Sequence, residues 1–259
     1  MGTKRVDTGR GGRSNVVKRQ RAGRNRALYA SLAVIALVGA FLIYRSAGQP
    51  ARATTIADVP ASNLQAEGYL KGNADAPVQI LEFADFECPA CAQFATITEP
   101  DVRTRLIETG IANLRFFDYP LEQHRNSLAA HNAAACAAEQ EKFWEMHDRL
   151  FAGQVDWSTQ STSNPKRIFS RYAREIGVDE NRWEECFDSG RNQAKIRANQ
   201  QEGNRRRIQS TPTFVIGRRM VPGAISYDEL KRLVDSARVE TAAATPAPTK
   251  AAGDTTRAQ

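Results

Sequence analysis

Two cysteines separated by two residues, Cys88 and Cys91, are the residues best placed for chemistry in this sequence. An apolar run ends just before them and a helical pattern follows, so Cys88 is predicted as the N-cap of a helix whose first residue is Pro89. The free amides of the first helical turn and the helix dipole then favour the Cys88 thiolate. Cys91 lies one turn deeper on the same side, where it can attack a mixed disulfide formed on Cys88. The pair therefore predicts thiol–disulfide exchange.

Half of a zinc site is the alternative reading of a Cys-x-x-Cys segment. A zinc ribbon needs a second closely spaced pair, whereas Cys136 and Cys186 are fifty residues apart. We therefore expect no metal. Exchange between sulfur atoms also requires no bound cofactor.

The positive charge of the chain is concentrated at its N-terminus. The formal net charge is +7, but residues 1–26 hold nine Lys or Arg and one acid. The other 233 residues hold 27 Lys or Arg against 28 Asp or Glu. The rest of the chain is nearly neutral, which excludes a basic face for nucleic acid.

An uncharged run of 18 residues, from Ala27 to Tyr44, follows the basic segment directly. This is about the length that crosses a bilayer core of ~30 Å, and the preceding cations place residues 1–26 in the cytoplasm. We predict a single-pass membrane anchor at residues 27–44 with the catalytic domain outside the cytoplasm. The alternative is a cleaved signal peptide, because Ala51-Arg52-Ala53 resembles a cleavage site. Either way the domain is exported to a compartment in which disulfides persist.

The remaining chain divides into a linker at residues 45–69, a globular domain at residues 70–240 and a tail. The tail, residues 241–259, lacks large apolar side chains and is predicted to be disordered. Alternation and apolar runs predict strands, and helical periodicity covers most of residues 125–202. The strands are expected at Val78–Phe83, Asn113–Tyr119, Thr213–Ile216 and Met220–Val221. This order predicts an α/β domain with a helical insertion at about residues 122–202.

Taken together, the motifs resemble the DsbA-like thioredoxin family, in its membrane-anchored branch. The resemblance covers about residues 68–239 and implies a thioredoxin fold with an inserted all-helical domain. Its motifs are Gly72–Val78, the strand with Glu82, Phe86–Cys91, Asp118–Leu121, Lys142–Asp148 and Thr211–Phe214.

The resemblance also assigns residues to substrate binding. Pro212 falls at the position of the family's cis-proline, which lies beside the active disulfide. The backbone of Thr211 would then pair with an extended substrate segment. Pro89 and Ala90, between the two cysteines, complete the expected binding set.

Three further residues receive roles from the resemblance. Glu82 stands where the family carries a buried acid, and we expect it to exchange a proton with Cys91; the alternative is a solvated carboxylate at the end of a strand. Cys136 and Cys186 lie in the predicted insertion, where several family members carry a structural disulfide; the alternative is two buried free thiols. His131 and His147 are expected to be packing or surface residues, and His124 is assigned no role.

The family's activity implies an oxidase that introduces disulfides into reduced exported proteins. A membrane oxidase of the DsbB type, or a quinone-linked oxidase of the VKOR-like type, would recycle it. Ala90 stands where the strongest oxidants of the family have histidine, and threonine before the proline occurs in isomerases too, so a reductase or isomerase stays open. The alternative of another class is a redox-inert, membrane-tethered chaperone, against which the intact Cys-x-x-Cys argues.

Overall fold

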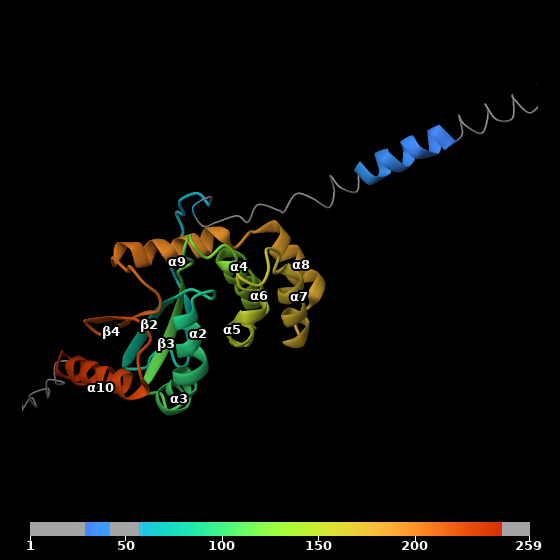
Figure 1. The fold of residues 1–259 in the computed structure, drawn as a ribbon. Helices are drawn as coiled ribbons and strands as arrows, with labels where there is room; N and C mark the ends of the chain where they lie inside the picture. Colours follow the sequence, from blue (N-terminus) through green and yellow to red (C-terminus); the bar gives the residue numbers. More distant parts are fainter. Residues whose placement is uncertain (1–28, 42–56, 58, 245–259) are drawn as a thin grey trace, which may run out of the picture. The chain divides into compact units, whose positions relative to one another are not determined.

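The computed structural model describes residues 29–41, 57 and 59–244, and the chain forms two units, Met1–Arg52 and Ala53–Gln259. The first unit contains a helix over residues 29–41, shown in blue in Figure 1. Among the helices within the described ranges, none is both long enough and apolar enough to cross a membrane. The predicted basic segment and both ends of the predicted anchor lie outside the described residues.

A five-stranded sheet forms the centre of the second unit (Figure 1). Its spatial order is β1-β3-β2-β4-β5, with β2 and β3 parallel and the other neighbours antiparallel. A central strand is covered on both faces, which suits the apolar run that was predicted there. The strands are β1 (Tyr69–Lys71), β2 (Val78–Ala84), β3 (Ala112–Asp118), β4 (Thr213–Ile216) and β5 (Arg219–Pro222).

A parallel pair needs a crossover, and a helical segment supplies it between β2 and β3. The segment changes pitch along its length, through α2 (Pro89–Gln93), the π-helical turn η2 (Phe94–Thr98), α3 (Glu99–Val102) and the π-helical turn η3 (Arg103–Ile107). Pro100 cannot donate to the preceding turn, which favours such irregular pitch. The segment packs on one face of the sheet together with α10 (Tyr227–Ala244).

The opposite face of the sheet is crossed by α9 (Gln193–Arg205), which lies on the other side from α10 in Figure 1. The approach is close, because a Cβ added at Gly203 would lie 2.5 Å from the Tyr119 ring. The Tyr119 hydroxyl lies 2.8 Å from the Ile208 carbonyl oxygen, to which it donates. A glycine is therefore required where the helix passes over the end of β3.

The helices between β3 and α9 enclose a second hydrophobic core. They are α4 (Ser127–Ala138), α5 (Phe143–Ala152), α6 (Gln154–Trp157), α7 (Lys166–Glu175) and α8 (Glu180–Ser189). The alanines of α4 let neighbouring helices approach closely around the fully buried Trp157, Tyr172 and Trp183. The predicted mixed α/β architecture with much helix between its strands is confirmed.

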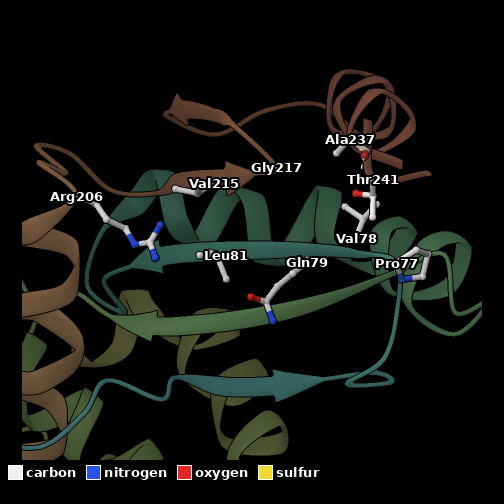
Figure 2. A pocket seen from close by; sticks show the side chains of 9 residues that line it. All are labelled: Pro77, Val78, Gln79, Leu81, Arg206, Val215, Gly217, Ala237 and Thr241. Atoms are coloured by element: carbon white, nitrogen blue, oxygen red, sulfur yellow. Dashed lines mark hydrogen bonds between the residues drawn. The ribbon is translucent and has the colours of Figure 1, made fainter. Parts of the chain in front are cut away.

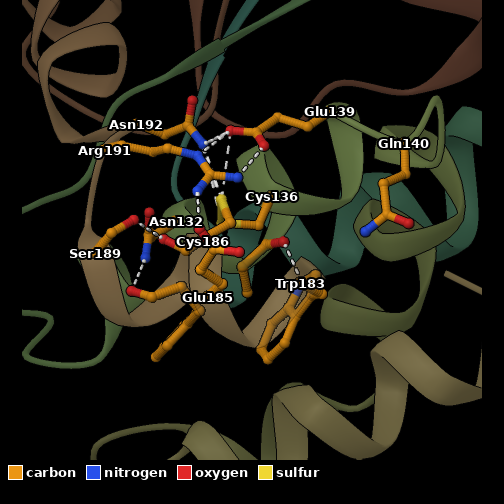
Figure 3. Close-up of a disulfide and its surroundings, with 12 residues drawn as sticks. Asn132, Cys136, Glu139, Gln140, Trp183, Glu185, Cys186, Ser189, Arg191 and Asn192 are labelled. Carbon is orange, nitrogen blue, oxygen red and sulfur yellow. Dashed lines mark hydrogen bonds and ion pairs between the residues drawn. A yellow bond between two sulfur atoms is a disulfide. The ribbon is translucent and has the colours of Figure 1, made fainter. Parts of the chain in front are cut away.

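A disulfide joins Cys136 of α4 to Cys186 of α8, and both residues are fully buried (Figure 3). The neighbouring Trp183 indole donates to the Ala133 carbonyl over 3.1 Å. At the rim, the guanidinium of Arg191 lies 2.6 Å from the carboxylate of Glu139. The disulfide therefore joins α4, the first helix of the insertion, to α8.

Three details of the predicted elements are wrong. The linker was expected to reach residue 69, but Tyr69 begins β1. The short helix α6 was not predicted, because four residues are too few to show a period. The tail was expected to be disordered from residue 241, yet α10 continues to Ala244, since alanine has the highest helix propensity. The rest of the predicted tail lies outside the described residues.

Replacing Cys136 and Cys186 together by alanine should lower the free energy of unfolding by ~2–4 kcal/mol, because the disulfide closes a loop of 50 residues. Urea denaturation followed by tryptophan fluorescence measures this, with Cys88 and Cys91 replaced by alanine in both proteins so that no reductant is needed. An unchanged free energy of unfolding would mean that the bond does not restrict the unfolded chain.

Candidate active site

Cys88 lies at the junction between the end of β2 and the start of α2. It is the N-cap of α2, with an extended backbone, and Pro89 is the first helical residue. Its own amide donates to the Asp85 carbonyl over 3.0 Å, which closes the turn between strand and helix. Cys88 is 8% exposed and Cys91 is fully buried. Both are free thiols in this structure. Because of the difference in burial, the Cys88 sulfur can be reached from solvent and the Cys91 sulfur cannot.

The two thiols have opposite pKa shifts. The pKa of Cys88 is lowered from 9.0 to about 6, first by a hydrogen bond from the Cys91 thiol, while burial acts in the opposite direction. Hydrogen bonds from Thr211 and from the backbone of Cys91 and Ala90 lower it further. The pKa of Cys91 is raised well above its usual value by burial, and then by its hydrogen bond to Cys88 and the charge there. At neutral pH the site therefore holds one thiolate and one protonated thiol.

The predicted substrate-binding residues surround the accessible sulfur. The Thr211–Pro212 peptide bond is cis, and the Cys88 thiol donates to the Thr211 carbonyl oxygen over 3.4 Å. The buried Thr211 hydroxyl has no other hydrogen-bond partner among the described residues, so its proton is available to the thiolate. Pro89 is exposed and Ala90 is half-buried. An incoming sulfur thus meets Cys88 between the start of α2 and the loop before β4.

Glu82 is fully buried in β2, on the same face as Ile80. Within the described part of the chain, neither of its carboxyl oxygens has a hydrogen-bond partner. Burial raises its pKa well above the usual value, the charge of Glu99 raises it further, and Arg103 opposes both. The group therefore holds a proton far more readily than an ordinary glutamate does.

Asp85 is a site residue that the sequence interpretation missed. One of its buried carboxyl oxygens accepts from the Glu87 amide (2.8 Å) and the Ser127 hydroxyl (2.5 Å). The other accepts from the Leu121 amide (2.9 Å) and lies 2.8 Å from His124 Nδ1. The Asp85 hydrogen bond is the first cause of the raised pKa of His124. An acid directly after a buried strand, three residues before the cysteine, was the available signal.

The helical insertion also holds the active segment, by contacts that the sequence did not reveal. The Gln154 amide of α6 donates to the carbonyl oxygens of Phe86 (2.7 Å) and Cys88 (3.1 Å). The Glu87 carboxylate accepts from the amides of Asn126 (2.8 Å) and Thr159. The backbone on both sides of Cys88 is thereby tied to helices that lie far away in the sequence.

Two cavities among the described residues lie away from the thiols. Figure 2 shows one of about 190 Å³ between β2, β4 and α10, lined by residues such as Leu81, Val215 and Ala237. Another, of about 680 Å³, lies against α7. Neither is lined by Cys88 or its neighbours. In the described ranges, no group of three or more His, Cys, Asp or Glu residues is arranged to hold a metal ion.

A protein-family model described as thioredoxin matches residues 65–236. Among curated proteins, a Na(+)/H(+) antiporter NhaA of Salinispora tropica is 33% identical over 170 residues, which are 65% of this chain and 24% of the antiporter. The chain thus spans about a quarter of that relative's length. The disulfide bond formation protein D of Bacillus subtilis is 25% identical over 169 residues, covering 63% of this chain and 74% of that protein.

A solved structure has the same fold. The crystal structure of oxidised BdbD from Bacillus subtilis superposes with a TM-score of 0.61 at 22% identity, covering 70% of this chain and 100% of that chain. At this level of identity the likeness concerns the fold alone.

Alkylation of the reduced protein by iodoacetamide should have a midpoint near pH 6, because only the thiolate reacts. Since this pKa is lowered, the stability that the thiolate gives the reduced protein is complete above pH 9 and is lost as the pH falls through about 6. Mass spectrometry of the labelled peptides should find the label on Cys88. Preferential labelling of Cys91, or a midpoint above pH 8, would contradict the assignment.

Proposed function

The chain belongs to the thioredoxin family and has a DsbA-like fold, and from this premise we propose that it is an extracytoplasmic thiol:disulfide oxidoreductase that introduces disulfides into exported proteins. The observation that carries the proposal is the pair of opposite pKa shifts at Cys88 and Cys91. A stabilised thiolate favours the reduced form, so the corresponding disulfide is a better oxidant.

The reaction begins with the Cys88–Cys91 disulfide. A substrate thiolate attacks the accessible Cys88 sulfur, the S–S bond breaks, and Cys91 leaves as a thiolate that takes up a proton. The second substrate thiolate then attacks the mixed disulfide at the substrate's own sulfur. Cys88 departs readily as a thiolate because its pKa is low. Two electrons have passed from the substrate dithiol to the protein, and the substrate holds a disulfide.

Glu82 is proposed as the group that exchanges the proton of Cys91. Its raised pKa, caused by burial and by Glu99, keeps it protonated where an ordinary glutamate would be ionised. No hydrogen bond joins Glu82 to Cys91 in the part of the chain that the structure describes, so the transfer runs through water. The same carboxylate takes the proton back when the disulfide forms again.

The substrate is proposed to bind as an extended segment against the backbone of Thr211. Strand addition satisfies main-chain groups whatever the side chains are, which suits an enzyme with many substrates. Pro212, Pro89 and Ala90 would form the surface around the reacting sulfur. The substrates are reduced exported proteins.

The protein is proposed to be anchored in the cell membrane by residues 27–44, with its catalytic domain outside the cytoplasm. The support is the uncharged run, the cations before it, and the helix over residues 29–41, whose large apolar side chains, such as Ile35 and Leu37, are exposed. Exposed apolar surface of this kind calls for an apolar environment. A membrane oxidase of the DsbB or VKOR-like type would then reoxidise the dithiol.

A reductase or isomerase with the same residues is the competing proposal, and Ala90 is the observation that favours it. A histidine at this position would add a donor to the Cys88 thiolate, and alanine does not. A redox-inert chaperone is disfavoured, since binding alone requires no thiol of lowered pKa.

Replacing Cys91 by alanine should trap mixed disulfides with substrates, because the resolving sulfur is absent. Replacing Cys88 by alanine should trap none. Non-reducing electrophoresis of cells that express each variant measures this, and the Cys136→Ala, Cys186→Ala protein serves as the control for unrelated thiols. Equal trapping by the two single variants would contradict the division of roles.

The direction of electron flow is tested by equilibration with glutathione buffers. We expect a reduction potential between about −120 mV, the value of DsbA, and about −270 mV, that of thioredoxin. Refolding of reduced ribonuclease should then be accelerated more than reduction of insulin. A potential near −270 mV, with Cys88 mostly reduced in cells, would turn the conclusion to a reductase.

A further inference from the structure

Four buried polar atoms without hydrogen-bond partners belong to Glu82 and to two residues that the exchange chemistry leaves unexplained. They are both carboxyl oxygens of Glu82, Oε2 of Glu99 and Nε2 of His147, each unpartnered among the described residues. All three residues are fully buried. Unpaired buried polar atoms cost free energy, so a gathering of them calls for a function.

Two of these atoms face each other. His147 Nε2 lies 3.7 Å from Glu99 Oε2, a gap that a small side-chain movement closes to hydrogen-bond length. The other oxygen of Glu99 accepts from Arg103 Nε over 2.6 Å. Glu99 in turn acts on Glu82, because its charge is the next cause after burial of the raised pKa of Glu82. The two acids and the imidazole therefore form one electrostatic group.

The group reaches solvent through its last member. His147 Nδ1 lies 2.8 Å from Asp148 Oδ1, and the Asp148 side chain is 52% exposed. An imidazole can take up a proton at one nitrogen and release one from the other. Nδ1 also lies 3.3 Å from Nη2 of Arg103, which only donates, so these contacts accommodate a proton on either nitrogen of His147.

The group joins the two parts of the domain. Glu82 and Glu99 come from β2 and α3, whereas His147 and Asp148 come from α5 of the insertion. Rings of Phe86, Phe116 and Phe143 surround the imidazole and exclude water from its flanks. Two other charged side chains face the group. Arg103 is 2.6 Å from Asp148. The pKa of Lys71 of β1 is lowered by burial and by Arg103, while Asp148 and Glu99 act in the opposite direction.

We propose that Glu99 and His147 carry protons between Glu82 and solvent at Asp148, so that the helical insertion supplies the exit of the proton path. The proposal rests on the proposed function. When Cys91 leaves as a thiolate, Glu82 gives it a proton and becomes a carboxylate. His147 then gives its Nε2 proton to the Glu99 carboxylate, Glu99 hands a proton on to Glu82 and is again a carboxylate, and His147 takes up a proton at Nδ1 from the solvent side. Reoxidation of the dithiol runs the same transfers in reverse.

Stopped-flow measurement of the oxidised protein reacting with a reduced dithiol peptide tests the path, with the full chain in detergent. Glu99→Gln keeps the shape of the side chain, and His147→Phe fits among the surrounding rings. Each should slow the reaction by roughly ten- to a hundredfold, since positioned proton transfer typically contributes factors of that order or more. Asp101→Asn, an exposed acid of the same helix, is the matched control and should react at the wild-type rate.

A double-mutant cycle separates proton transfer from mere packing. In a Glu82→Gln background, Glu99→Gln and His147→Phe should slow the reaction no further, because glutamine at this position cannot accept the proton that Glu99 passes on. Glu99→Gln alone should also move the alkaline limb of the pH–rate profile to lower pH, since Glu82 donates its proton in this reaction and removing the Glu99 charge lowers its pKa.

Each result has a definite consequence. Additive losses in the Glu82→Gln background, or wild-type rates in Glu99→Gln and His147→Phe, would overturn the path. Alkylation of Cys88 should keep its midpoint near pH 6 in every variant, which shows that the thiol site is folded. If the wild-type protein itself does not exchange disulfides with the peptide, the proposed function fails, and this outcome differs from every outcome that overturns the path alone.

Discussion

The position of Cys88 at the N-cap of α2, with the buried Cys91 one turn further along the helix, is the constraint on which the rest of the site depends. Interaction with Cys91 is the first cause of the lowered pKa of Cys88, and interaction with Cys88 adds to the effect of burial in raising the pKa of Cys91. Two chemically identical side chains thus differ in pKa because of position alone. Cys88 lies at the N-terminus of α2, and Cys91 lies one turn further along the helix. The two thiols differ in reactivity and in their quality as leaving groups because their pKa values differ.

Keeping that pair in place requires both parts of the domain. The sheet supplies Asp85, whose carboxyl holds the turn before Cys88, and the insertion supplies Gln154, which binds the carbonyl oxygens on both sides of Glu87. The disulfide between Cys136 and Cys186 joins α4 to α8, in the same insertion as α6, which carries Gln154. The insertion therefore supports the active segment directly, because Cys88 and Cys91 belong to the same hydrophobic cluster as its helices.

Burial of acids is the main cost in this architecture. Glu82 and Glu99 are both fully buried, and since the charge of Glu99 raises the pKa of Glu82, the two carboxyls would repel each other if both were ionised. The neighbouring Arg103 offsets part of this cost by binding Glu99. A proton on Glu82 removes the remaining part of this cost. Glu82 therefore holds a proton that it can give to the departing thiolate of Cys91.

The sequence alone determined the dithiol, four of the five described strands and the helical insertion, because these depend on spacing and periodicity within short segments. The N-cap position of Cys88 followed from a strand pattern, a proline and a helix pattern in succession. The positions proposed for Pro212 and for the two cysteines of the insertion came from the family resemblance. None of these required knowledge of distant contacts.

Only the tertiary structure placed Asp85, His124, Gln154 and His147 around the site. Their contacts join residues 36 to 68 positions apart, and no local pattern encodes which helix of the insertion faces which end of the sheet. His147 had been expected to pack, and it does, but its ring also meets Glu99 from another element. Burial and electrostatic coupling are properties of the folded whole, so the pKa shifts of Glu82 and Cys91 become visible only after packing has removed them from water.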